Sequence, residues 1–207
     1  MVQGVGANSR RILPGLGGKG QSASTGLYSL SNHCLCLYNS KAMTIDYFNE
    51  SEKYRPKTIK TLLVGEAPPS SGKTYFYVPK AMSDKILIQK DSSLPATIFN
   101  HYFQKRPTTV EKYVDFLRLL KAKGIFLIDI CDEPIKVRNN PEGIQRIKKE
   151  IPALQGKMKR KNINVAVEGI LFLLARNNYI KDIKREFPNS TYKSWKDFRM
   201  SPELCNL

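Results

Sequence analysis

Cysteine and histidine are scarce in this sequence, and their scarcity limits the metal chemistry open to it. Thiolate and imidazole ligands could come only from Cys34, Cys36, Cys131, Cys205, His33 and His101. The cysteines make neither a dense disulfide framework nor a CxxC pair, and Cys34 and Cys36 are too close for the usual zinc knuckle. We therefore expect reduced thiols in a reducing compartment, the cytoplasm, with neither a metal nor a cofactor.

Long apolar runs are absent as well. No stretch approaches the roughly 18 to 20 apolar residues that cross a bilayer, and the longest apolar clusters, such as residues 124–130, have the length of a core strand. With 207 residues, of which 41% are hydrophobic, the chain can bury a substantial core. The sequence predicts a monomeric globular domain without a membrane span.

Acidic residues are strongly outnumbered. The 18 Asp and Glu against 34 Lys and Arg give a net charge of +16. Such a surplus attracts phosphate backbones, so we predict a nucleic acid as the partner, although basic runs can also be solvated faces. Residues 136–161 alone hold nine Lys or Arg. The predicted nucleic-acid contacts are Lys73, Lys157, Lys159, Arg160, Lys161 and Lys193.

Residues 1–42 contain no acidic residue at all, and Gly and Ser recur through "LPGLGGKGQSASTG". This composition predicts a disordered basic extension. It would also suit an organelle transit peptide, although it contains no clean amphipathic helix, and Met43 could equally be the true start. The predicted folded domain is residues 43–207, which by themselves keep 30 basic against 18 acidic residues.

From residue 57 onward, apolar runs of strand length alternate with helical patterns. "TTVE" at 108–111 is a capping box that opens the clearest helix, and Gly124 closes it. Strands are predicted at 58–66, 124–130 and 163–167, and helices at 110–123, from Pro141 toward Gln155, and at 170–175, while 86–103 has no clear pattern. This order predicts an α/β fold, a three-layer sandwich around a mostly parallel four-stranded sheet.

The stretch "TLLVGEAPPSSGKTYFY" at 61–77 permits two interpretations. Residues 67–74 nearly match a Walker A phosphate loop, with Ala67 in place of the first Gly. That loop needs consecutive backbone N–H groups and a helix that begins at Lys73. Pro68 and Pro69 have no N–H to offer, and "YFYVP" at 75–79 favours extended structure. A phosphate-loop nucleotide-binding protein therefore stays the least favoured alternative.

The second interpretation starts from Glu66, which follows Gly65 at the end of a predicted strand. In an open α/β sheet the ligand crevice lies beyond the carboxyl ends of the strands. Two prolines directly downstream fix the path of the loop. The sequence therefore predicts a carboxylate held at the mouth of such a crevice.

With Glu66 in this position, "LLVGEAPPSSGKTYFY" resembles the first motif of the uracil-DNA glycosylase superfamily. In that motif a strand ends in Gly, a water-activating acid or amide, a small residue and Pro, and the form with Glu is most similar to the bacterial and archaeal thermostable branches. "GIFLIDICDEPIK", "KNINVAVEG" and "REFPNSTYKSW" are similar in place to the second core strand, a later strand and the second catalytic loop. The resemblance covers residues 57–195 and implies a uracil-DNA glycosylase-like fold.

The resemblance implies a DNA-repair hydrolase that cuts the N-glycosidic bond of uracil or a related damaged base, with the base turned out of the stack. Glu66 would activate the water, and Asn189 would hydrogen-bond the departing base. The implied substrate contacts are Gly65, Ala67 and Pro68, the stacking candidates Tyr75, Phe76 and Tyr77, the second-loop residues Pro188 and Ser190, and the wedge Tyr192.

Two departures from the family pattern stand out. Phe187 occupies the position of a His that would stabilise the departing base, and the four cysteines do not match the spacing of the iron–sulfur cluster of the thermostable branches. We expect no cluster, and either activity on another base or a non-catalytic nucleic-acid-binding protein of the same fold.

Several of these residues also have a purely structural interpretation. The three aromatic residues at 75–77 fit core and surface alternation on a strand. Asp129 ends a buried strand near the same crevice, where it either contacts substrate or is a hydrogen-bonded structural residue. His101 is predicted as a half-buried structural imidazole.

Overall fold

The computed structural model describes residues 45–69, 75–79, 93–136 and 140–200. The chain divides into a unit of residues 1–40 and a unit of residues 41–207, and all described residues belong to the second. The predicted basic extension, residues 1–42, lies outside them.

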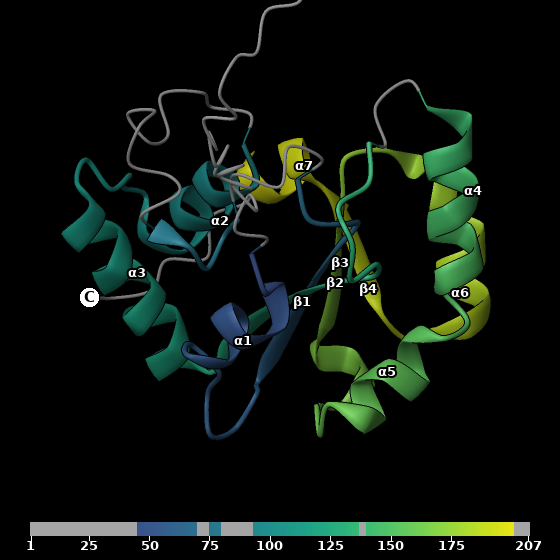
Figure 1. Cartoon of the computed structure of the whole chain (residues 1–207), viewed down its shortest axis with the longest axis horizontal. Coiled ribbons are helices and arrows are strands. Elements are labelled where there is room, and N and C mark those ends of the chain that lie inside the picture. The colour runs from purple at the N-terminus through teal and green to yellow at the C-terminus, as the bar shows by residue number, and fades with distance from the viewer. Residues whose placement is uncertain (1–44, 70–74, 80–92, 137–139, 201–207) are drawn as a thin grey trace, which may run out of the picture. The chain divides into compact units, whose positions relative to one another are not determined.

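A four-stranded sheet forms the centre of this unit (Figure 1). Its strands are β1 (Thr61–Gly65), β2 (Ile125–Asp129), β3 (Ile170–Leu174) and β4 (Thr191–Ser194). They pair in the order β2-β1-β3-β4, and every pair is parallel. β1 and β2 are almost completely buried because helices cover both faces of a parallel sheet. The predicted α/β class and four-stranded parallel sheet are confirmed.

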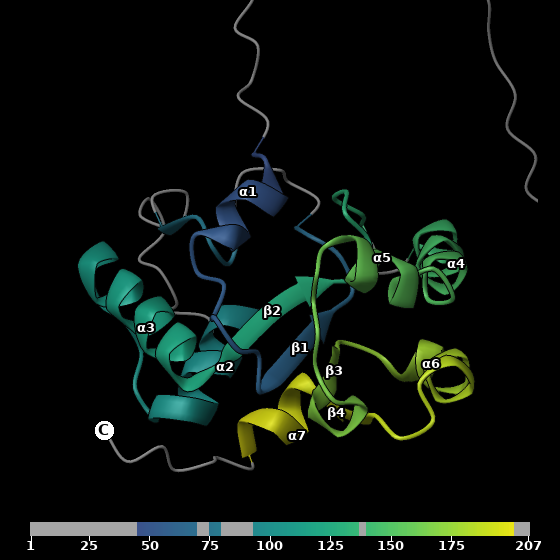
Figure 2. The ribbon, with the colours of Figure 1, turned by 90° about the horizontal axis from the view of Figure 1, so that it is seen from below.

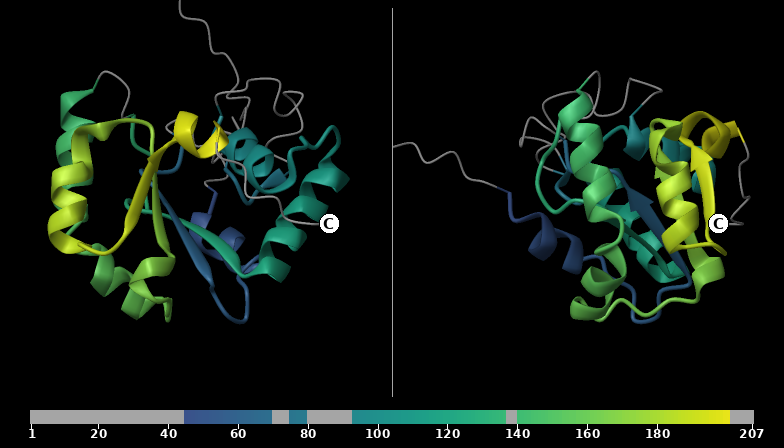
Figure 3. Two further views of the ribbon diagram at one scale, coloured as in Figure 1. Left: turned by 180° about the vertical axis from the view of Figure 1, so that it is seen from behind. Right: turned by 90° about the vertical axis from the view of Figure 1, so that its right-hand side faces the viewer.

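Helices lie on both sides of the sheet (Figures 1 and 2). One face carries α2 (Leu94–Phe103), α3 (Val110–Lys123) and α7 (Trp195–Met200), and the other carries α4 (Pro141–Glu150), α5 (Leu154–Arg160) and α6 (Ile180–Glu186). The right-hand view of Figure 3 shows α4 and α6 side by side, and Lys148 and Asp182 face each other between them at 4.0 Å. The short helix α1 (Tyr47–Glu52) lies near the β2 edge (Figure 2).

The best-predicted helix is α3, because its ends carry explicit signals. The Thr109 side chain accepts a hydrogen bond from the Lys112 backbone N–H at 3.2 Å, so the cap lies one residue later than the predicted box. Gly124 ends the helix with φ of 79°, a left-handed conformation that glycine adopts without strain. Helix α2, which the sequence left undefined, begins with a similar cap at Ser93.

The structure corrects the predictions for the later elements. Residues 163–166 are not a strand, and residues 170–174, predicted as helix, form β3. A short continuous apolar run such as "ILFLL" has no period that separates a buried strand from a buried helix. The helix predicted from Pro141 toward Gln155 is interrupted between α4 and α5, and β4 was not predicted as a strand.

Within the described ranges, no helix is both long enough and apolar enough to pass through a bilayer.

Candidate active site at the carboxyl ends of β1 and β2

The candidate site lies where β1 and β2 end side by side. Gly65 is the register partner of Asp129, so the residues that follow the two strands start from the same level of the sheet. The backbone pairing continues past the strands, since the Ile130 N–H donates to the Gly65 carbonyl at 2.9 Å and the Cys131 N–H to the Glu66 carbonyl at 3.2 Å. The two strand ends are therefore held together as one rigid edge.

Gly65 makes room for the Asp129 side chain. A Cβ atom placed on Gly65 would lie 2.5 Å from Asp129 Oδ1, a separation that real Cβ atoms essentially never show. The absence of a side chain at residue 65 therefore lets the Asp129 carboxylate lie directly against β1. Steric crowding by Asp129 thus explains why residue 65 of the motif is glycine.

Glu66 links the end of β1 to the end of β3. Its side chain is buried, and Oε1 accepts a hydrogen bond from the Ala175 backbone N–H at 3.0 Å. Burial raises the pKa of Glu66, while backbone hydrogen bonds from Ala175 and Arg176 and the charge of Arg176 act in the opposite direction. The predicted placement of Glu66 at a strand end is confirmed, and its orientation is fixed by the β3 turn.

Asp129 is the most strongly perturbed carboxyl of the site. It is only 8% exposed, and burial raises its pKa to about 7. The Lys157 charge opposes this shift, whereas the nearby charges of Asp132 and Glu66 add to it. A carboxyl with a pKa near neutrality can both accept and release a proton at physiological pH, as a general base or acid requires.

Lys157 supports the loop after β2 from α5. Its Nζ donates to the carbonyls of Asp129 at 2.7 Å and Ile130 at 3.1 Å, and it pairs with Asp132 at 2.8 Å. The Lys157 side chain is buried, so the prediction that it contacts nucleic acid from the surface is wrong. Lys161, one helical turn on, shares the Asp132 carboxylate at 2.9 Å and is partly buried by that contact.

A small cavity lies beside Asp129. Its volume is about 20 Å³, enough for one water-sized molecule and far below that of a nucleobase. Tyr75, Pro68 and Cys131 line it from the sheet side. Helix α1 contributes Tyr47 and Phe48, α5 contributes Lys157, and Lys161 follows directly after α5. The cavity thus joins the titratable Asp129 carboxyl to an aromatic wall that includes Tyr75, and Pro68 also lines it, whereas Glu66 is not among its lining residues.

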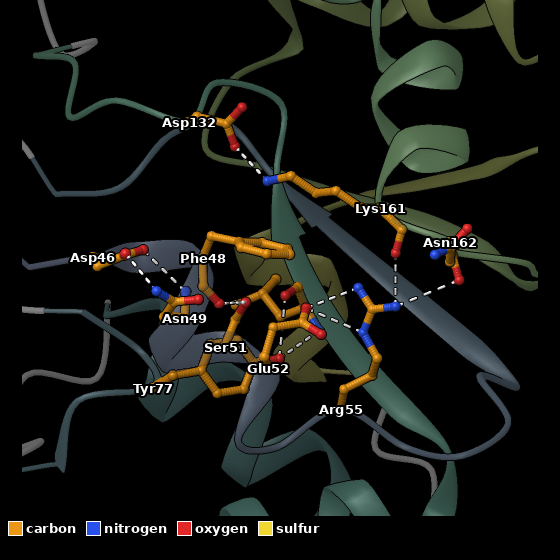
Figure 4. Close-up of polar contacts among 11 residues, drawn as sticks. Asp46, Phe48, Asn49, Ser51, Glu52, Arg55, Tyr77, Asp132, Lys161 and Asn162 are labelled. Atoms are coloured by element: carbon orange, nitrogen blue, oxygen red, sulfur yellow. Dashed lines mark hydrogen bonds and ion pairs between the residues drawn. The ribbon is translucent and has the colours of Figure 1, made fainter.

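Helix α1 is fastened to α5 over this cavity (Figure 4). Arg55, just after α1, donates to the Lys161 carbonyl at 2.7 Å and pairs with Glu52 at 2.8 Å. The Lys161 ammonium lies 4.3 Å from the centre of the Phe48 ring, and its Nζ reaches Asp132. The backbone and the side chain of Lys161, the residue directly after α5, therefore both hold α1 in place.

The aromatic residues at 75–77 have different surroundings. Tyr77 exchanges two hydrogen bonds with Leu127, and its hydroxyl lies 2.7 Å from the Leu127 nitrogen and 3.2 Å from its oxygen. Tyr113 donates to the Phe76 carbonyl at 2.9 Å, and Phe76 packs on Phe99. Phe76 and Tyr77 are thus core residues, and of the three aromatic residues at 75–77 only Tyr75 lines the cavity.

The second predicted loop lies at the other end of the sheet. Thr191 is the register partner of Leu171, at the amino-terminal side of β3, whereas Glu66 contacts Ala175 beyond its carboxyl end. Asn189, in the turn before β4, is therefore a full strand length from Glu66. The prediction that both belong to one catalytic site is wrong, and the same displacement applies to Pro188 and Ser190.

Ser194 and Trp195, and not Asn189, lie at the carboxyl end of β4. Ser194 accepts a hydrogen bond from the Asp197 N–H at 3.1 Å and so caps α7, while Trp195 Nε1 donates to the Leu173 carbonyl at 3.3 Å. Phe187, predicted in place of a catalytic His, is buried and packs against Phe172.

The remaining predicted contacts are spread over the surface. Tyr192 is on the edge strand β4, with the Lys184 ammonium 5.2 Å from its ring centre. Lys159 and Arg160 are exposed on α5, Lys193 is partly buried, and Lys73 lies outside the described residues.

Residues 75–78 form a turn, with the Val78 N–H bonded to the Tyr75 carbonyl, instead of the helix that a phosphate loop needs. His101 was predicted to be half-buried, but it is fully buried, and its Nδ1 lies 2.7 Å from the Phe198 carbonyl oxygen.

The part of the chain that the structure describes contains no group of three or more His, Cys, Asp or Glu residues arranged to hold a metal ion. No protein-family model matches the chain, and no curated protein or solved structure matches it either.

Proposed function

We propose that the protein hydrolyses the N-glycosidic bond of uracil or a related damaged base in DNA, and that its fold is uracil-DNA glycosylase-like. The observation that carries the proposal is the pair of buried carboxyls, Glu66 and Asp129, on neighbouring strand ends, with Tyr75 and Pro68 on the wall of the adjoining cavity. The net charge of +16 supports DNA as the substrate.

In the proposed reaction, Glu66 orients a water whose oxygen attacks C1′ of the sugar. The bond between C1′ and the base nitrogen breaks, and its electron pair leaves with the base. The proton lost by the water passes to Asp129, whose pKa of about 7 suits both uptake and release, and ends on the departing base. Backbone N–H groups at 175 and 176 fix the Glu66 carboxylate, so little reorganisation is needed during the step.

The proposal is tested with a uracil-containing oligonucleotide, followed by alkali to break abasic sites. Glu66→Gln and Asp129→Asn should each lower the yield of strand breaks by roughly 10²-fold or more, the size typical of a lost general base or water ligand. Glu142→Gln, an exposed acid on α4, is the matched control and should cleave like the wild type. Cleavage that survives in Glu66→Gln would remove Glu66 from the reaction.

A non-catalytic nucleic-acid-binding protein is the second candidate. Two observations favour it: the cavity of about 20 Å³ is too small for a base, and Phe187 is packed in the core, where it cannot assist a leaving group. This candidate predicts binding that weakens steeply with salt and no cleavage of any substrate in a panel of modified bases. Exposed Lys159 and Arg160 should then carry part of the salt dependence.

A further inference from the structure

Tyr179 buries a hydroxyl group that has no hydrogen-bond partner among the residues the structure describes. The residue closes the short 3-10 helix Asn177–Tyr179 that follows β3, and its side chain is 0% exposed. Tyr77 and Tyr113, which are also buried, use their hydroxyls to bond the backbone of Leu127 and Phe76. Tyr179 differs in this respect from Tyr77 and Tyr113.

An unpartnered buried hydroxyl is costly to the fold. Leaving one polar group of this kind without a partner costs about 1 to 3 kcal/mol, and phenylalanine would fill the same space without that cost. Buried polar groups in native proteins bond to protein atoms or to bound molecules, so an orphaned one indicates a ligand or a functional role. Packing alone gives no reason for tyrosine at this position.

The surroundings of Tyr179 connect it to Glu66. The turn after β3 begins with Ala175, whose N–H binds the Glu66 carboxylate, and it ends at Tyr179. Glu66 and Arg176, which follow the carboxyl ends of β1 and β3, are charged groups that act on the Tyr179 hydroxyl. Burial and the Glu66 charge both raise the pKa of Tyr179, so the phenol stays protonated and keeps a hydrogen to donate.

We infer that the Tyr179 hydroxyl and the Glu66 carboxylate together bind one water molecule, and that Tyr179 is a positioning residue for the attacking water of the proposed reaction. The second half of this inference rests on the proposed function. The phenol donates to the water oxygen, and the water donates one hydrogen to Glu66. The water is then held by a donor and an acceptor, which leaves a lone pair to attack the sugar.

The test compares the wild type with Tyr179→Phe by following the Glu66 carboxyl in a ¹³C NMR titration. Loss of the water-mediated hydrogen bond that favours the charged form should raise the pKa of Glu66 by about 0.5 or more. Tyr113→Phe is the matched control, because it removes a hydrogen bond to the Phe76 carbonyl. It should lower stability and leave the Glu66 titration unchanged.

Turnover gives a separate readout. In an active protein, Tyr179→Phe should lower kcat by roughly tenfold or more with little change in KM, as expected when a group acts on the water and not on substrate binding. A raised Glu66 pKa in a protein that cleaves nothing would uphold the water site and reject the proposed function. An unchanged Glu66 pKa would overturn the inference whatever the activity.

Discussion

The carboxylate of Asp129 lies against the α-carbon of Gly65, and its Oδ1 is 2.5 Å from the place where a Cβ on that glycine would be. The contact joins the ends of two neighbouring strands and fixes the most strongly perturbed carboxyl of the site. The geometry of the site thus depends on Gly65, which has no side chain, and on Asp129, whose carboxyl group is buried.

Gly65→Ala should displace the Asp129 carboxylate and destabilise the fold by about 1 to 3 kcal/mol, because neither strand end can move away from the added methyl. Gly156→Ala is the control, since the nearest atom to its new Cβ is Arg160 Nη1 at 3.4 Å and the residue lies within α5. That change should leave stability equal or raise it by up to about 1 kcal/mol. Urea unfolding measures both, and equal midpoints would show that the contact has no energetic weight.

Asp129→Asn should change how stability depends on pH. The folded-state pKa of Asp129 is raised from 3.8 to about 7. The contribution of Asp129 to the unfolding free energy is therefore complete below about pH 4 and is lost as the pH rises through 7. A shift of this size corresponds to at most on the order of 4 kcal/mol. In Asp129→Asn, the unfolding free energy should not show this decrease between pH 4 and 7.5.

Asp132→Asn gives the opposite sign and is the control for this titration. Hydrogen bonds and charges of Lys157 and Lys161 outweigh burial and lower the pKa of Asp132, so its contribution is present at neutral pH and lost on acidification. Two variants with parallel pH profiles would contradict the assignment of the raised pKa to Asp129.

Lys157→Met keeps the aliphatic stem but removes the ammonium group that donates to the loop after β2. Two buried carbonyls lose this donor and the Asp132 carboxylate keeps only Lys161, so we expect a loss of about 2 to 4 kcal/mol in unfolding free energy. Because the Lys157 charge lowers the pKa of Asp129, that pKa should also rise further in the variant. Lys159→Met, two residues on and exposed, should stay within about 0.5 kcal/mol of the wild type.

The sequence predicted those elements whose signals are local. Helix α3 has a threonine cap and a terminal glycine, and the strands ending at Gly65 and Asp129 are apolar runs bounded by turn residues. The position of Glu66 followed from the end of its strand. Each of these conclusions needed only neighbouring residues, and each was confirmed.

Other features depend on contacts between distant segments. The exposed and half-buried residues of β4 give no apolar run, so the turn before it was assigned to the wrong end of the sheet and Asn189 to the wrong site. Lys157 belongs to a basic run, and nothing in its composition indicates which lysine turns inward. The fully buried Tyr179 hydroxyl could be recognised only once the turn after β3 was placed.

The link between α1 and α5 differs in kind from the ion pairs around it. Arg55 donates to the main-chain oxygens of residues 161 and 162, which every amino acid supplies. Replacement of Lys161 would abolish its contacts with Phe48 and Asp132 yet leave the guanidinium its acceptors. Substitutions at residues 161 and 162, directly after α5, would therefore preserve the hydrogen bonds of Arg55, whereas a single substitution of Arg55 would remove them.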